Sequence, residues 1–130
     1  MTNGGSVDKI VIKEKIWQYL TLEIFPDPSI FANSSLEAEF NNFDVSLSIW
    51  QSLFMSSLNK LYGLIGEASP YEIMVRKSKH EVVLKIQFQD LEKFSNCFLS
   101  YTFNLSRFSD LDLPCFIRVV NRGEYIGQIV

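Results

Sequence analysis

Histidines, cysteines and clustered acids are the residues with which a small chain could carry out chemistry, and this chain has few of them. Among its 130 residues are one histidine, His80, and two cysteines. His80 stands between Lys79 and Glu81 in a predicted hairpin turn, which offers neither an orienting partner nor a pocket. We therefore expect a solvated His80 and not a catalytic base.

The cysteines and the acids also lack the spacing that chemistry requires. Cys97 and Cys115 lie in apolar stretches, and their spacing fits neither a disulfide framework nor a zinc motif. We expect reduced core thiols in a reducing compartment. The acids form no cluster that predicts a metal site, and no phosphate- or dinucleotide-binding glycine motif is present. The residues predict a protein with no catalytic residue, metal or cofactor.

Charge argues against a protein that binds nucleic acid strongly by itself. The formal net charge is −3 and the sequence pI is about 5.1, whereas such proteins usually carry a basic surplus. No Lys or Arg occurs between Ile16 and Asn59, and the densest basic segment begins at Arg76. If the chain contacts RNA, we expect the contact at five basic residues: Arg76, Lys77, Lys79, Arg118 and Arg122.

The first predicted element is a strand over residues 16–25. Its aliphatic residues alternate from Leu20 to Ile24 and predict a face turned to the core. The other face carries Trp17, Tyr19 and Phe25. Three large aromatics in water would be unusual for a monomer, so we expect them to contact a protein partner.

Two amphipathic helices are predicted, one from an Asp44 N-cap to about residue 62 and one from an Asp90 N-cap with a stripe reaching Leu105. The intervening segment 26–43 is read as a connection without its own element. On the first helix, Ile49 and Leu53 widen the apolar stripe. They offer a second possible route to the partner, helix against helix instead of sheet against sheet.

Three further strands complete the pattern, at residues 71–76, 81–89 and 115–120. The order β-α-β-β-α-β predicts an α+β, ferredoxin-like fold, with a four-stranded antiparallel sheet and both helices on one face. We expect residues 1–13 to be a flexible N-terminal segment and residues 14–130 to form a single domain.

A glycine-containing run follows the first predicted helix. In KLYGLIGEA, Gly63 is expected to stop the helix and Gly66 to allow a sharp turn into the next strand. The run Tyr62, Gly63, Gly66 and Glu67 is therefore interpreted as shaping the fold, with Tyr62 and Glu67 as possible additional contacts to a partner.

Several segments together carry a family resemblance: the IWQYLTLEI strand, the KLYGLIGEA helix end, and the VVLKIQF strand followed by an acid-capped, Phe-rich helix. In this order they resemble the small Pop-type protein subunits of ribonuclease P and ribonuclease MRP. The resemblance is to the fungal Pop-eight subunits in particular, whose animal counterpart is the fourteen-kilodalton Rpp protein. It covers about residues 14–120, and the GEYIGQIV end matches nothing in the family.

The resemblance implies a noncatalytic subunit, because in that family the catalyst is RNA and the proteins shape and stabilise it. It implies processing of precursor tRNA and rRNA in the nucleus and nucleolus. The implied partners are a sister Pop-type subunit of like fold, forming a heterodimer, and the other ribonuclease P/MRP proteins. Contact with the catalytic RNA would come mainly through the assembly, without cofactor or membrane.

The rival hypothesis is a direct RNA-binding module of the RNA-recognition type, which has the same topology. Such modules stack bases on aromatics of the first and third strands. Here the third strand presents Val83, Lys85 and Gln87 outward, with no aromatic pair, so docking of a protein is favoured. A third reading, a small-molecule sensing domain, would need a pocket that the sequence does not reveal.

Overall fold

The computed structural model describes residues 16–67 and 70–124. The predicted flexible segment 1–13 and the last six residues of the chain lie outside the described residues. The described elements, in chain order, are β1 (Trp17–Pro26), the 3-10 turn η1 (Pro28–Ala32), α2 (Ser34–Asn42), α3 (Leu47–Glu67), β2 (Tyr71–Arg76), β3 (Glu81–Gln87), η2 (Phe88–Asp90), α4 (Leu91–Ser100), β4 (Thr102–Asn104), η3 (Leu105–Arg107) and β5 (Pro114–Gly123).

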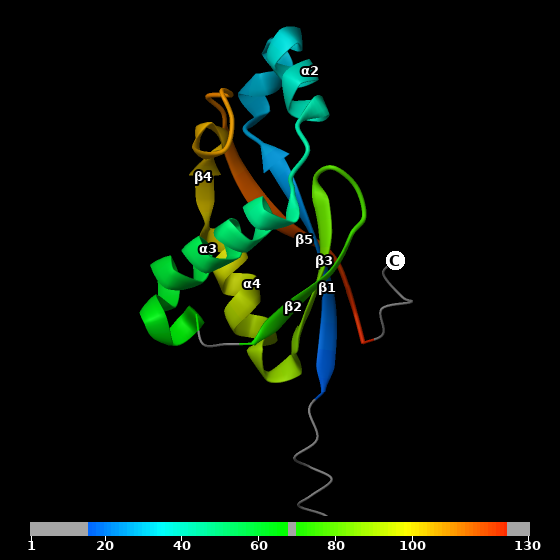
Figure 1. Cartoon of the computed structure of the whole chain (residues 1–130), viewed down its shortest axis with the longest axis vertical. Coiled ribbons are helices and arrows are strands. Elements are labelled where there is room, and N and C mark those ends of the chain that lie inside the picture. The colour runs from blue at the N-terminus through cyan, green and yellow to red at the C-terminus, as the bar shows by residue number, and fades with distance from the viewer. Residues whose placement is uncertain (1–15, 68–69, 125–130) are drawn as a thin grey trace, which may run out of the picture.

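The strands form one antiparallel sheet in the order β2-β3-β1-β5-β4 (Figure 1). Its first four members follow the ferredoxin-like order, with β1 between β3 and β5. The α+β, ferredoxin-like prediction is therefore confirmed in outline and corrected in count. The described sheet has five strands instead of four, because β4 adds a short edge strand beside β5. The described part also has one helix more than the two predicted, α2.

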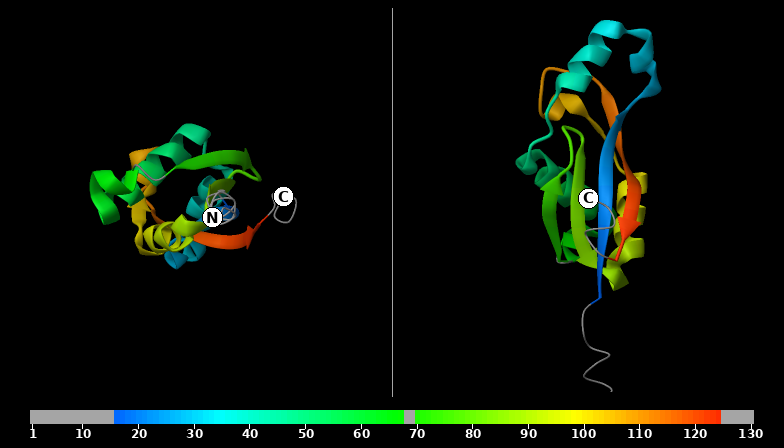
Figure 2. Two further views of the ribbon diagram at one scale, coloured as in Figure 1. Left: turned by 90° about the horizontal axis from the view of Figure 1, so that it is seen from below. Right: turned by 90° about the vertical axis from the view of Figure 1, so that its right-hand side faces the viewer.

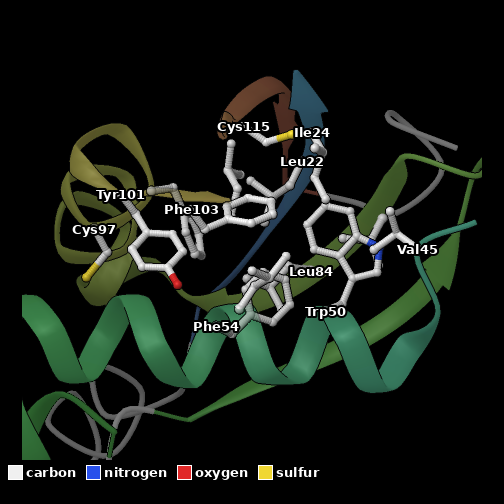
Figure 3. Packing of buried hydrophobic residues seen from close by; sticks show 14 of the residues in the cluster. Leu22, Ile24, Val45, Trp50, Phe54, Leu84, Cys97, Tyr101, Phe103 and Cys115 are labelled. Carbon is white, nitrogen blue, oxygen red and sulfur yellow. The ribbon is translucent and has the colours of Figure 1, made fainter. Parts of the chain in front are cut away.

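Helices α3 and α4 lie on the same face of this sheet (Figure 2). The core between sheet and helices is rich in aromatic rings (Figure 3). Phe54 of α3 lies at its centre, with ring centroids 5.6 Å from Trp50, 5.6 Å from Tyr71 and 5.5 Å from Phe98. Beneath the helices, Leu22 of β1 is fully buried, as the alternation predicted, and so are Leu84 and Ile86 of β3.

Helix α3 begins and ends later than predicted. The Ser46 hydroxyl accepts a hydrogen bond from the Ile49 N–H at 3.3 Å, so Ser46 and not Asp44 caps the helix. Asp44 instead pairs with Arg76 at 2.9 Å. Gly63 does not stop the helix either: α3 continues to Glu67, since an internal glycine only weakens a helix that packing supports.

Helix α4 is shorter than predicted, because the chain after Ser100 becomes extended. Tyr101, Phe103 and Leu105 are all buried, and their period of two is that of a strand. Tyr101 and Leu105 also fit a helical spacing from Phe94 and Phe98, which produced the longer prediction.

Segment 26–43, predicted as a plain connection, contains η1 and α2. The Asn33 carboxamide accepts a hydrogen bond from the Leu36 N–H at 3.1 Å and caps α2. The helix was missed because it is short and polar, with Phe40 as its buried residue. No described helix is long and apolar enough to cross a membrane.

Candidate interaction surface on the helix-free face

The sheet has a second face that none of the described helices covers, which we call the helix-free face (Figure 2). Alternate residues of β1 lie on it, and the register places each beside a neighbour on β3 or β5. The described members from the three central strands are Trp17, Tyr19, Thr21, Glu23 and Phe25 of β1, Glu81, Val83, Lys85 and Gln87 of β3, and Phe116, Arg118, Asn121 and Gly123 of β5.

Aromatic rings lie toward both ends of this face. Phe25 and Phe116 are register partners, and their rings stack with centroids 5.9 Å apart and planes 8° apart. The Arg118 guanidinium lies 4.2 Å from the centroid of Phe116. At the other end the Lys85 ammonium lies 4.5 Å from the ring centroid of Trp17. At each end of the face, a cation therefore lies against an aromatic ring.

The predicted partner residues Trp17, Tyr19 and Phe25 all lie on this face, with Phe25 at the opposite end from Trp17, and all three are half-buried. Sequence reasoning missed Phe116. Its signal was present, because Phe116 alternates with the buried Cys115 and Ile117 in a predicted strand, but only the register reveals its partner Phe25.

The middle of the face is polar at Glu23. Burial raises the pKa of this carboxyl above its ordinary value, the charge of Glu81 raises it further, and His80 acts in the opposite direction. Glu81 and Arg118 are its register neighbours on the two sides. Next to this row, Thr21 and Val83 are fully buried, so the face is not uniformly exposed.

The helix-edge route to a partner is contradicted for Leu53. Its side chain is fully buried in the core, and Ile49 is half-buried against that core. The stripe is wide because α3 packs against both the sheet and α4, so these residues face inward and not toward a partner.

The five basic candidates do not form one patch. Arg76 is engaged by Asp44 at 2.9 Å and donates to the Val45 carbonyl at 3.0 Å. Lys77 and Lys79 are exposed near the β2–β3 turn. Arg118 and Arg122 lie on β5, on opposite faces of the sheet, since their register partners are Glu23 and Leu20.

His80 is half-buried, which corrects the expectation of a solvated side chain. Its Nε2 lies 3.0 Å from the carbonyl oxygens of both Phe40 and Phe43, and its ring lies 4.4 Å from that of Phe40. Carbonyl oxygens only accept hydrogen bonds, so Nε2 carries a proton and donates it. His80 therefore fastens the C-terminal end of α2 to the hairpin turn.

The described part of the chain assembles no candidate metal centre. It contains no group of three or more His, Cys, Asp or Glu residues placed to hold a metal ion. Cys97 and Cys115 are buried free thiols, as predicted, and burial raises their pKa values to about 11 and about 12. The Tyr62, Gly63, Gly66 and Glu67 run lies within the last turns of α3, and its side chains fall outside the described part.

The described residues thus form a ferredoxin-like α+β domain with an aromatic helix-free face. Residues 16–101, more than half of the chain, match the family model described as ribonucleases P/MRP protein subunit Pop8. The chain therefore belongs to the Pop8 family, and the resemblance seen in the sequence is confirmed.

Comparison with solved structures agrees on the fold. A chain in the cryo-EM structure of yeast ribonuclease MRP superposes with a TM-score of 0.66 at 17% sequence identity, covering 86% of this chain and 76% of that chain. At this identity the likeness concerns the fold. A search of curated proteins gave no match.

Proposed function

We propose that this chain is a noncatalytic protein subunit of the ribonuclease P/MRP ribonucleoprotein, which scaffolds the RNA enzyme that processes precursor tRNA and rRNA. The match of residues 16–101 to the Pop8 family carries this proposal. The buried thiols and the engaged His80 support a noncatalytic role, because neither is available as a nucleophile or base. The proposed site of action is the nucleus and nucleolus.

The proposed main partner is a sister Pop-type subunit of like fold, bound through the helix-free face as a heterodimer. Four aromatic side chains support this face: Trp17, Tyr19, Phe25 and Phe116. Aromatic anchors carry much of the binding energy in protein interfaces. A net charge of −3 also suits a subunit held mainly by protein, since few phosphate contacts are then required.

Membership of the assembly is tested by purifying the tagged full chain from its source and sequencing the RNA that accompanies it. Enrichment of the ribonuclease P RNA, the ribonuclease MRP RNA or both is expected, and the pattern tells which holoenzyme contains the chain. A preparation without either RNA would contradict the proposal.

The interface is tested by Trp17→Ala combined with Tyr19→Ala. Truncating aromatic anchors commonly costs about 2 kcal/mol or more, so the double variant should lose the sister subunit in a pull-down. Met55→Ala is the matched control, because this side chain is 54% exposed on α3, away from the helix-free face. Both proteins should keep the circular dichroism of the parent. A double variant that folds and retains its partner would rule out this face.

One observation favours a second candidate, direct RNA binding. Two cations lie against aromatic rings on the helix-free face, Lys85 against Trp17 and Arg118 against Phe116. Aromatic and Arg surfaces of this kind stack unpaired bases. Crosslinking to RNA separates the candidates: base stacking predicts crosslinks at Trp17 or Phe116, whereas the charge argument places incidental contacts at Lys77 and Lys79.

A further inference from the structure

The outer edge of β5 is only partly paired. Strand β4 pairs with Pro114–Phe116, whereas β5 continues to Gly123. Among the described strands, β4 is the only neighbour of β5 on this side. More than half of the strand therefore presents an edge beyond the end of β4, and such edges are templates for pairing with another chain.

The direction of the backbone groups along this edge follows from the β1–β5 ladder. The Pro114 carbonyl accepts a hydrogen bond from the Asp27 N–H at 2.9 Å, so Pro114 directs its backbone toward β1. Because this direction alternates from residue to residue in an antiparallel strand, Ile117 and Val119 direct their N–H and C=O groups outward. These groups lie past the last pair between β4 and β5, which joins Thr102 to Phe116.

A groove lies beside the same edge, between α4 and β5, with a volume of about 480 Å³. Its α4 side is formed by Ser95 and Leu99, and its β5 side by residues 117–122. Leu99 is 69% exposed and Val120 is 43% exposed. Two large apolar side chains thus lie at a groove that also borders unpaired backbone groups.

The charge of the groove is positive. Its lining includes Arg118 and Arg122 and no acidic residue. Arg118 lies on the helix-free face opposite Glu23, and Arg122 lies on the helix side opposite Leu20. A strand added along this edge would therefore meet one arginine on each of its faces. A second copy of this chain, paired along the same edge, would place arginines beside arginines. The repulsion between these like charges disfavours such a pairing.

We propose that the β5 edge accepts an extended segment of a partner protein as an additional strand. Its apolar side chains would pack on Leu99 and Val120, and its acidic side chains would pair with Arg118 and Arg122. The proposal rests on the proposed function, since the segment belongs to another protein of the ribonuclease assembly. It concerns a strand beyond residue 101, outside the residues that the family model matches.

Hydrogen exchange of the full chain tests the proposal, in isolation and within the assembly purified through a tag on this chain. The Ile117 and Val119 amides should exchange rapidly in the isolated chain and at least about tenfold more slowly in the assembly. Co-purified ribonuclease RNA reports membership independently, so the two proposals can fail separately. Equal exchange in both samples, with the RNA present, would overturn the strand.

Val119→Pro removes one outward N–H without removing a bond to β1, and proline is tolerated at such edge positions. Val119→Ala is the matched control, because it shortens the same half-buried side chain and keeps the N–H. In the assembly, Ile117 should lose its protection in the proline variant and retain it in the alanine variant. Equal protection in both variants would count against backbone pairing.

Other occupants give different results, and each overturns the proposal. Protection that disappears after nuclease digestion of the RNA would assign the groove to RNA. Protection already present in the isolated chain would assign it to a second copy if it rises with concentration. It would assign the groove to the chain's own residues 125–130 if it is lost on their removal.

Discussion

At the scale of single residues, the histidine proved structural. His80 donates to the carbonyls of Phe40 and Phe43 and packs on the Phe40 ring. His80→Ala should lower the free energy of unfolding by about 2 kcal/mol, because it removes the hydrogen bond shared by the two carbonyls and also removes a ring contact.

Urea denaturation measures this change, with Lys79→Ala as the control. The Lys79 side chain is exposed, so its truncation should change stability by no more than about 0.5 kcal/mol. Equal midpoints for the two variants would show that the His80 contacts contribute nothing.

Glu23 gives a pH dependence with a definite sign. Burial and then the charge of Glu81 raise its pKa in the folded state. The unfolded chain therefore loses this proton first, and stability falls as pH rises through the folded pKa. Glu23→Gln should raise the free energy of unfolding at pH 7, by less than about 1 kcal/mol because the group is partly solvated, and should leave it unchanged at pH 3.

Glu39→Gln on exposed α2 is the control for this pH profile. Denaturation curves at several pH values measure both variants. A Glu23→Gln protein that is destabilised at pH 7 would show that the fold favours the carboxylate, whose register neighbour on β5 is Arg118.

At the scale of elements, two polar contacts lie at the start of α3: the Ser46 cap and the ion pair of Asp44 with Arg76. Ser46→Ala should cost about 1 kcal/mol, because the Ile49 N–H loses its acceptor. Asp44→Ala should cost less, since its pair with Arg76 is partly exposed. Thermal unfolding at low and high salt distinguishes them: only the Asp44 effect should shrink at 1 M salt, where the Debye length is about 3 Å instead of about 10 Å at 0.1 M.

The strands were predictable because alternation places every second residue of β1 and β3 in the core. The elements that were missed carry weak or conflicting signals. Helix α2 buries Phe40 alone, and Tyr101 and Leu105 fit both a helix and a strand. His80 was misjudged for a different reason: its partners lie 40 and 37 residues earlier in the chain, and sequence reasoning cannot place them.

The candidate face was predictable only in part. Trp17, Tyr19 and Phe25 follow from the period of β1, whereas the stacking of Phe25 on Phe116 depends on the register between two distant strands. The same limit explains Leu53: a wide apolar stripe shows that a helix is covered, but not whether its own domain or a partner covers it.

At the scale of the whole molecule, charge governs how the isolated chain meets RNA. With a net charge of −3 and its basic residues dispersed, the purified chain should bind generic tRNA weakly, with a shallow dependence on salt. Filter binding across salt concentrations measures this. A steep slope together with tight binding would favour the RNA-recognition alternative, and cleavage of precursor tRNA by the pure chain would contradict the noncatalytic role.

The central place of β1 has a consequence for the order in which the molecule forms. β1 is synthesised first among the described strands. Its residue Tyr19, however, pairs with Lys85 on one side and with Gly123 on the other, and both are synthesised much later. Such distant pairings slow folding, because the chain must close long loops before the contacts repay their cost. Until β5 leaves the ribosome, β1 has no strand partner along one of its two edges. The nascent chain therefore passes through a stage in which a chaperone or an early-binding partner would protect it from aggregation.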